Sequence, residues 1–192
     1  QKNNIDVFTQ NIPKKKTFDL TFGQKNIANA IKIGIRKSKT KYIVYFFTPD
    51  GNMLPEKLEE LIKTAKSGYD FVTVSRYKKP AISYDDSIIS KFGNHLFTKL
   101  VNIFFRGNYT DVLGAYKIIN KKIIDEKFLD NCNITINTQI SIRCLKKKFP
   151  YKDIPGDEPK REFGASSRSV IINGLMELYT ILSAFIIKDK FK

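Results

Sequence analysis

Apolar residues follow two different spacings in the first part of the chain, and each spacing predicts one kind of element. From residue 26 to residue 37 they recur every three or four positions, which predicts an amphipathic helix. Residues 42–47 are apolar without a break and rich in β-branched and aromatic side chains, which is typical of a strand buried on both faces. The turn sequence TPDGN at residues 48–52 ends this strand.

A second helix and a second strand complete an α/β unit. Pro55 and several glutamates open the helix, whose apolar stripe consists of Leu58, Leu61, Ile62 and Ala65. After a Ser-Gly stop, residues 69–74 return to a strand pattern. Strand, helix and strand alternating at these lengths predict an α/β domain with a parallel sheet.

Longer helical patterns dominate the second half of the chain. A polar loop at residues 78–86 precedes a long helix expected at residues 87–105. The side chains that this helix offers for packing are Ile88, Ile89, Phe92, Leu96, Leu100, Ile103 and Phe104. A short segment at residues 111–119 leads to an ambiguous helical region at 122–147 and then to a polar loop at 150–169.

The apolar stretch at residues 170–187 allows three interpretations. It could pack on the domain or dimerise, or it could lie in the interface of an anionic membrane, with the lysines at 188, 190 and 192 facing the lipid headgroups. The third interpretation is a membrane-spanning helix. This is costly, because Glu177 would place a carboxyl group near the middle of the membrane.

Composition narrows the function classes without choosing among them. The 192 residues are 42% hydrophobic, which excludes wholesale disorder and suits a single domain. Two cysteines and one histidine exclude a disulfide scaffold, a four-cysteine zinc site and a histidine cluster. With 34 Lys+Arg against 19 Asp+Glu, the net charge of +15 indicates an anionic partner, although the excess is mostly lysine and also fits a compositional bias. No aromatic residues interleave with basic ones as in nucleic-acid-binding modules, so nucleic acid is not expected as a partner.

Candidate chemistry gathers where the predicted strands end. Asp50 and Asn52 follow the first strand and could share a hard cation such as Mg²⁺ or Mn²⁺, or could form an ordinary Asp-Gly turn. Arg76 closes the second strand, and Arg161 and Arg168 lie in the late polar loop. Guanidinium groups bind phosphate oxygens in pairs, although each arginine could also be a solvated surface charge.

Five ordered blocks of sequence resemble family 2 glycosyltransferases, and most closely the dolichol-phosphate mannosyltransferase-like branch. The blocks are TPDGNMLPE at 48–56, GYDFV with SRY at 68–77, SKFGN at 90–94, TDVLGAYK at 110–117, and IP with REFGASSR at 154–168. They correspond in order to the family's Asp-x-Asp turn and Pro-Glu, its strand ending in Ser-Arg-Tyr, its phosphate-binding helix, its Asp-x-x-Ser-Gly-Phe-Arg segment and its late Arg-x-x-Gly-x-Ser-Lys loop.

The resemblance implies an α/β fold of the GT-A type, with a mostly parallel central sheet flanked by helices. It implies a nucleotide-sugar donor, Mg²⁺ or Mn²⁺, and a polyprenyl-phosphate or other lipid-linked or glycan acceptor in cell-envelope glycan synthesis. It places the protein peripherally on the cytoplasmic face of a membrane and allows a homo-oligomer. Residues 1–169 would form the glycosyltransferase domain and residues 170–192 an amphipathic, membrane-interfacial helix.

The resemblance also assigns roles to individual residues. Thr48, Asp50 and Asn52 would contact the metal, and Asp50 and Asp111 would be the catalytic acids, with hydrogen bonding to the turn at Gly114 as the structural alternative for Asp111. The side chains that would hold donor or acceptor phosphate oxygens are Arg76, Lys91, Arg161 and Arg168.

Several departures from the family pattern bear on activity. Thr48 replaces the first acid of the metal-binding turn, and no acid stands at Thr138-Gln139 in the helix before the final loop. The family's opening strand with its Asn-Glu turn is also absent. Either the chain lacks the first strand or strands of the fold, or it is a catalytically impaired module that acts in membrane or partner binding.

Overall fold

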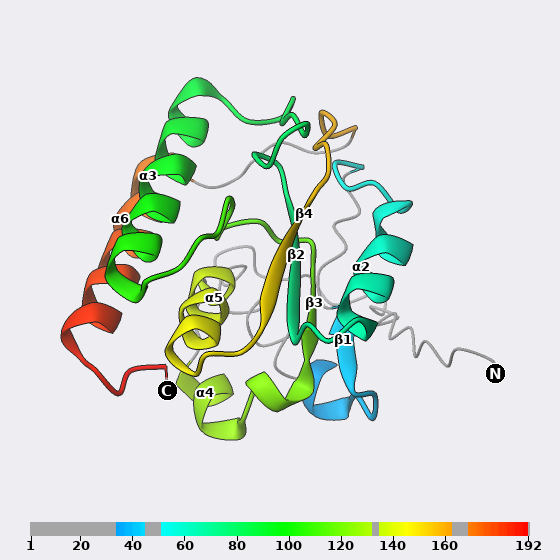
Figure 1. The fold of residues 1–192 in the computed structure, drawn as a ribbon. Coiled ribbons are helices and arrows are strands. Elements are labelled where there is room, and N and C mark those ends of the chain that lie inside the picture. Colours follow the sequence, from blue (N-terminus) through cyan, green and yellow to red (C-terminus); the bar gives the residue numbers. More distant parts are fainter. Residues whose placement is uncertain (1–33, 45–50, 132–134, 163–168, 192) are drawn as a thin grey trace, which may run out of the picture.

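A four-stranded sheet forms the centre of the protein (Figure 1). This computed structural model describes residues 34–44, 51–131, 135–162 and 169–191. Its strands are β1 (Tyr42–Val44), β2 (Phe71–Ser75), β3 (Lys117–Asn120) and β4 (Tyr151–Pro155), in the spatial order β1-β3-β2-β4. The predicted strands at 42–47 and 69–74 are therefore present, the first as far as residue 44, beyond which it lies outside the described residues.

The described sheet is mixed, whereas the sequence predicted a mostly parallel one. Strand β3 pairs antiparallel with both β1 and β2, so β1 and β2 run in the same direction without touching each other. Strand β4 pairs with β2 in parallel, with Phe71 opposite Tyr151. The two strands of the predicted α/β unit, β1 and β2, therefore run parallel as predicted. They are not neighbours in the sheet, because β3 lies between them.

Burial differs between the two predicted strands. All five residues of β2 are buried, as expected for a strand with neighbours on both edges and helices on both faces. In the described part of β1 only Ile43 is buried, and Tyr42 and Val44 are partly exposed. The expectation that this segment is buried on both faces is therefore wrong for residues 42–44.

Helices cover the two faces of the sheet. Helix α2 (Lys57–Lys66) lies on one face, where Leu61 and Ala65 pack against Val72 of β2 and Ile118 of β3. The other face packs against α3 (Ile88–Phe105), α5 (Ile136–Lys146) and α6 (Val170–Ile186). The ambiguous region at 122–147 resolves into the short helices η2 (Lys121–Ile123) and α4 (Glu126–Asn131) followed by α5.

Helix α3 begins and ends as its sequence predicts. The Ser87 hydroxyl caps it by accepting a hydrogen bond from the Ser90 N–H, and Arg106 ends it in the left-handed conformation. Its buried face, however, is formed by Asn94, Thr98 and Val101. Of the apolar side chains predicted to pack, Leu100 and Phe104 contact the core, whereas Ile88, Ile89, Phe92, Leu96 and Ile103 are exposed.

Helix α6 covers almost all of the apolar stretch predicted at 170–187. It packs against α3 and α5 through a face that buries Thr180, Ile181 and Ala184. Among the residues that the structure describes, no helix combines the length and apolar character needed to cross a membrane.

Candidate active site

A buried ion pair lies at the carboxyl end of β2. Arg76 follows this strand, and its Nε and Nη2 donate to the two oxygens of Asp111 at 2.7 and 3.0 Å. The Asp111 side chain is fully buried and also accepts a hydrogen bond from the Gly114 N–H at 2.9 Å. Burial alone would raise the pKa of Asp111, but the charge and hydrogen bonds of Arg76 hold that pKa below its usual value. The structural alternative expected for Asp111, a hydrogen bond to the Gly114 turn, is therefore present, and its catalytic role stays a prediction.

Two further carboxylates approach the same guanidinium. Asp86 and Glu158 each lie 3.4 Å from Arg76 Nη1. Burial raises the pKa of Glu158 despite the nearby positive charge of Arg76. The Arg76 side chain is therefore held by groups from three separate segments of the chain and is fixed in position at the edge of the sheet.

A pocket of about 160 Å³ opens beside this ion pair. Three predicted site residues, Asn52, Arg76 and Arg161, lie in its wall. Gly156 also lies in this wall. A larger residue does not fit there, because a Cβ at Gly156 would lie 2.3 Å from the Val74 Cγ1. The structure thus gathers residues that are more than a hundred positions apart in the sequence at one small cavity.

The other polar side chains of this pocket also contact carboxylates. Asn52 is buried, and its Nδ2 donates to Glu158 Oε1 at 3.4 Å. Arg161 binds Asp85 through Nε at 3.0 Å and Nη2 at 2.8 Å, and hydrogen bonding from Arg161 lowers the pKa of that carboxyl. In this structure, Arg76 and Arg161 therefore bind protein carboxylates, and their contacts with phosphate remain predictions.

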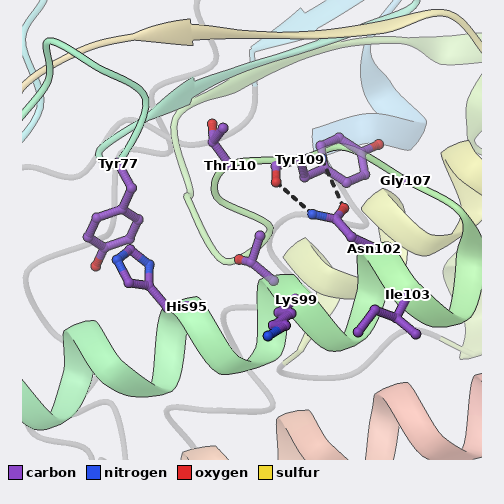
Figure 2. Close-up of a pocket in the computed structure, with 9 residues that line it drawn as sticks. Tyr77, His95, Lys99, Asn102, Ile103, Gly107, Tyr109 and Thr110 are labelled. Carbon is purple, nitrogen blue, oxygen red and sulfur yellow. Dashed lines mark hydrogen bonds between the residues drawn. The ribbon is translucent and has the colours of Figure 1, made fainter.

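A second, larger pocket of about 450 Å³ lies between the loop after β2 and helix α3 (Figure 2). Tyr77 and His95 meet in an edge-on ring contact with centroids 4.7 Å apart. Lys99 comes from the next turn of α3, and Thr110 from the segment that precedes Asp111. The Asn102 side chain donates to the Tyr109 carbonyl at 2.8 Å and accepts from the Tyr109 N–H at 2.9 Å. These two hydrogen bonds hold this segment against α3.

Two segments of the chain contribute residues to both pockets. Arg76 lines the smaller pocket and Tyr77 the larger one. Likewise, Thr110 lines the larger pocket, whereas Gly114 lines the smaller. The Arg76–Asp111 pair joins these two segments to each other.

A family model described as Glycosyl transferase family 2 matches residues 3–128. The chain belongs to this family. A search of curated proteins found no match. Family membership implies an α/β fold of the GT-A type and suggests glycosyltransferase activity.

The matched range places some site residues of this glycosyltransferase inside the family's domain and others beyond it. Arg76, Asp111 and the residues of α3 fall within residues 3–128. Glu158 and Arg161, which complete the smaller pocket, follow that range. The match concerns the family as a whole, so the dolichol-phosphate mannosyltransferase-like branch remains a prediction.

Four predicted site residues are not among those that the structure places at these pockets. Thr48, Asp50 and Arg168 are outside the described residues. Lys91 is exposed on the first turns of α3 and does not line either pocket. Within the described ranges, no cluster of three His, Cys, Asp or Glu side chains could hold a metal ion.

Several residues of this candidate site were not predicted. Glu158 follows β4, a strand whose residues have the sequence pattern of a polar loop. Recognising β4 would have placed Glu158 at the same carboxyl edge as Arg76. His95 and Lys99 carry a weaker signal, since together with Lys91 they recur every four residues on one side of α3.

Two titratable groups, the buried Lys117 and the partly buried Glu177, have strongly shifted pKa values. Lys117 of β3 is fully buried, and its Nζ has no hydrogen-bond partner among the described residues. Burial lowers the pKa of Lys117 to about 7, although nearby Asp111 and Asp153 oppose this shift. Glu177 of α6 is affected in the opposite sense, because burial raises its pKa to about 7. The two groups therefore titrate in the same range of pH.

Proposed function

We propose that this glycosyltransferase moves a sugar from a nucleotide-sugar donor to a polyprenyl phosphate or another lipid-linked acceptor. The observation that carries this proposal is the Arg76–Asp111 pair at the carboxyl end of β2, where Arg76 lines the smaller pocket and the next residue, Tyr77, lines the larger one. Two substrates must meet in a transfer reaction, and two pockets lined by adjacent residues of one segment suit such a reaction.

The smaller pocket is the proposed site of the donor diphosphate. It carries Lys57 and Arg161, and glycine backbone at Gly114 and Gly156 lets a ligand approach the main chain closely. Arg161 would exchange its contact with Asp85 for the diphosphate oxygens, to which a planar guanidinium donates two parallel hydrogen bonds.

The larger pocket is the proposed site of the acceptor phosphate. His95 and Lys99 line it, and Lys91 lies one turn earlier on the same side of α3. This row of basic side chains suits an anionic headgroup. Ile103 at the far end of the pocket provides an apolar contact for the first part of a lipid chain.

Chemically, the reaction would be a displacement at the anomeric carbon of the donor sugar. The attacking oxygen of a phosphate is already anionic at neutral pH, so no strong general base is needed. Arg76, held by Asp111 in a buried position, would place positive charge beside the reacting groups without reorganisation. Catalysis would rest on this fixed charge and on the alignment of the two substrates.

A divalent cation fits this scheme only with ligands from the turn at residues 48–52. The described part of that turn supplies the Asn52 amide oxygen, because Asn52 Nδ2 already donates to Glu158. We therefore propose that Asp50 and Thr48 provide the remaining protein ligands. A bound Mg²⁺ or Mn²⁺ would neutralise charge on the leaving nucleotide diphosphate.

Acceptor binding is tested by the double variant His95→Ala with Lys99→Ala. We expect it to raise the KM for polyprenyl phosphate at least about tenfold while leaving the donor KM unchanged, because each lost contact to a phosphate contributes about 1.5 kcal/mol or more. Lys63→Ala with Lys66→Ala, on the distant helix α2, is the matched control and should change neither constant. An unchanged acceptor KM in the first variant would contradict the assignment of this pocket, and absence of transfer by the wild-type chain would favour the impaired binding module.

A further inference from the structure

Exposed apolar side chains are concentrated on two neighbouring helices. Fourteen of the sixteen large hydrophobic residues that are exposed in the described structure belong to α3, to α6 or to the residue that caps α6. The two others are Ile82 and Tyr84 in the loop before α3. Apolar patches of this extent are uncommon on soluble monomers and mark interaction surfaces.

On α6 the exposed residues form one continuous stripe. Ile171, Leu175, Tyr179, Leu182 and Ile186 recur at intervals of three or four residues, so they share one side of the helix. Ile171 and Ile186, near the two ends of the stripe, are both 75% exposed. The opposite side of α6 is occupied by core contacts, so this stripe does not face the domain.

Helix α3 extends the same apolar surface. Figure 1 shows α3 and α6 side by side, and the Phe104 and Phe185 rings stack across them at 4.5 Å. Ile88 at the start of α3 is 89% exposed, and Phe92 one turn later is 69% exposed. We call this surface, formed by the exposed apolar residues of both helices, the α3–α6 face.

Lysines outnumber exposed acids around the α3–α6 face, where Asp189 beside Lys188 is the exposed acid among the described residues that follow α6. Helix α3 contains no Asp or Glu, and the single acid of α6, Glu177, has a buried carboxylate oxygen. Lys91 and Lys99 project from α3 and Lys188 follows α6, all three exposed. An apolar face bordered by three exposed lysines against the one exposed acid Asp189 complements an anionic lipid surface. It does not complement a second copy of itself, since pairing would bring lysines together.

We propose that the α3–α6 face binds the surface of an anionic lipid bilayer, with both helices parallel to the membrane plane. Exposed aliphatic and aromatic side chains would enter the boundary between headgroups and acyl chains, while the lysines contact lipid phosphates. Ile103 belongs to this face and also lines the larger pocket. If the proposed lipid-linked acceptor is correct, its phosphate would therefore reach Lys99 and His95 directly from the bilayer.

Vesicle co-sedimentation of the full chain, without donor or acceptor, tests the membrane contact separately from transfer. Vesicles of phosphatidylcholine with phosphatidylglycerol should bind the protein, and vesicles of phosphatidylcholine alone should bind it more weakly. Ile171→Ser with Leu175→Ser and Ile186→Ser should weaken binding at least about tenfold, because each change removes apolar area that would otherwise leave water. These exposed positions carry little of the fold, and circular dichroism and the melting temperature check that it is retained.

Ile82→Ser with Tyr84→Ser is the matched control, since it removes exposed apolar side chains outside the α3–α6 face and should leave vesicle binding unchanged. Equal vesicle binding by the triple variant and the wild type would overturn the proposal. A second result would also overturn it: neither protein binds vesicles, and light scattering shows that the wild type is a dimer and the triple variant a monomer. Transfer to a soluble short-chain acceptor reports on the proposed function alone, so a failure of one idea can be told from a failure of the other.

Discussion

The Arg76 guanidinium and the Asp111 carboxylate are joined by two hydrogen bonds, of 2.7 and 3.0 Å, around a carboxylate that has no exposure to solvent. The pair connects the end of β2 to the Gly114 turn, which the Asp111 carboxylate also holds. Because a buried charge that loses its partner is strongly destabilising, this contact supports both the fold and the position of the cation in the site.

Asp111→Asn should lower the free energy of unfolding by roughly 1–3 kcal/mol, since Arg76 would lose the nearest of its three carboxylate partners and keep Asp86 and Glu158. Urea denaturation measures this change. Glu126→Gln is the matched control, because Glu126 forms a 2.6 Å pair with Arg36 in which its own side chain is 69% exposed. Removing that exposed pair should cost less than about 1 kcal/mol, and equal effects of the two substitutions would show that burial of the Arg76–Asp111 pair has no energetic consequence.

Gly156→Ala should deform the smaller pocket. The new Cβ would lie 2.3 Å from the Val74 Cγ1, so the end of β2 or the side chain of Val74 must move, at a cost of roughly 1–3 kcal/mol. We expect weaker nucleotide-sugar binding in calorimetry together with a lower melting temperature. Gly34→Ala offers a contrast, because a Cβ added there would meet no atom within 4 Å beyond its own helical turn, so alanine should be neutral or slightly stabilising. A Gly156→Ala protein with wild-type stability and affinity would show that the close approach at Val74 is unimportant.

The buried Lys117 and the partly buried Glu177 should give the protein a stability minimum near pH 7. Between pH 4.5 and 7 the folded state keeps a proton on Glu177 that the unfolded state has released, so the free energy of unfolding falls as the pH rises. Between pH 7 and 10.5 the unfolded state holds a proton on Lys117 that the folded state has released, so the free energy of unfolding rises. Each contribution is on the order of 3 kcal/mol across its window.

Single substitutions separate the two contributions. Glu177→Gln should remove the fall below pH 7 and leave the rise above it, whereas Lys117→Met should do the reverse. Urea midpoints measured from pH 5 to pH 9 check both effects. A profile that rises steadily through pH 7 in the wild type would contradict the titration behaviour assigned to these two residues.

The sequence predicts the elements whose patterns are strongest. The α2 stripe at Leu61 and Ala65, the strand before Arg76 and the helix expected at residues 87–105 are all present in the structure. Strand β4 was missed because Lys152 and Asp153 break its apolar pattern. Asp153 is nevertheless buried, since it accepts hydrogen bonds from the Thr110 hydroxyl and N–H. A polar side chain that is buried by a partner far along the chain gives no local signal.

The site shows the same division. The strand pattern before Arg76 predicted that this residue lies at the carboxyl edge of the sheet. The resemblance to the family predicted that Asp111 belongs to the site. The partner Glu158 was not predicted, because its contact with Arg76 depends on β4 packing beside β2. Asp86 was not predicted either, because its contact depends on the path of the loop between β2 and α3. The exposed side of α3 was also misjudged, since periodicity shows that apolar residues share a face and does not show whether the domain or another surface covers it.

The decisive experiment for the proposed reaction is sugar transfer from a labelled nucleotide sugar to polyprenyl phosphate in vesicles, compared between the wild type and Arg76→Lys. The wild type should form lipid-linked product. Arg76→Lys should lower kcat at least about a hundredfold, because an ammonium group cannot make both hydrogen bonds to Asp111 and loses its fixed position. Arg36→Lys, at the exposed pair with Glu126, should keep wild-type kcat. Wild-type kcat in a folded Arg76→Lys protein would contradict the role assigned to the buried pair, and absence of product with every nucleotide sugar and polyprenyl phosphate tested would contradict the proposed reaction.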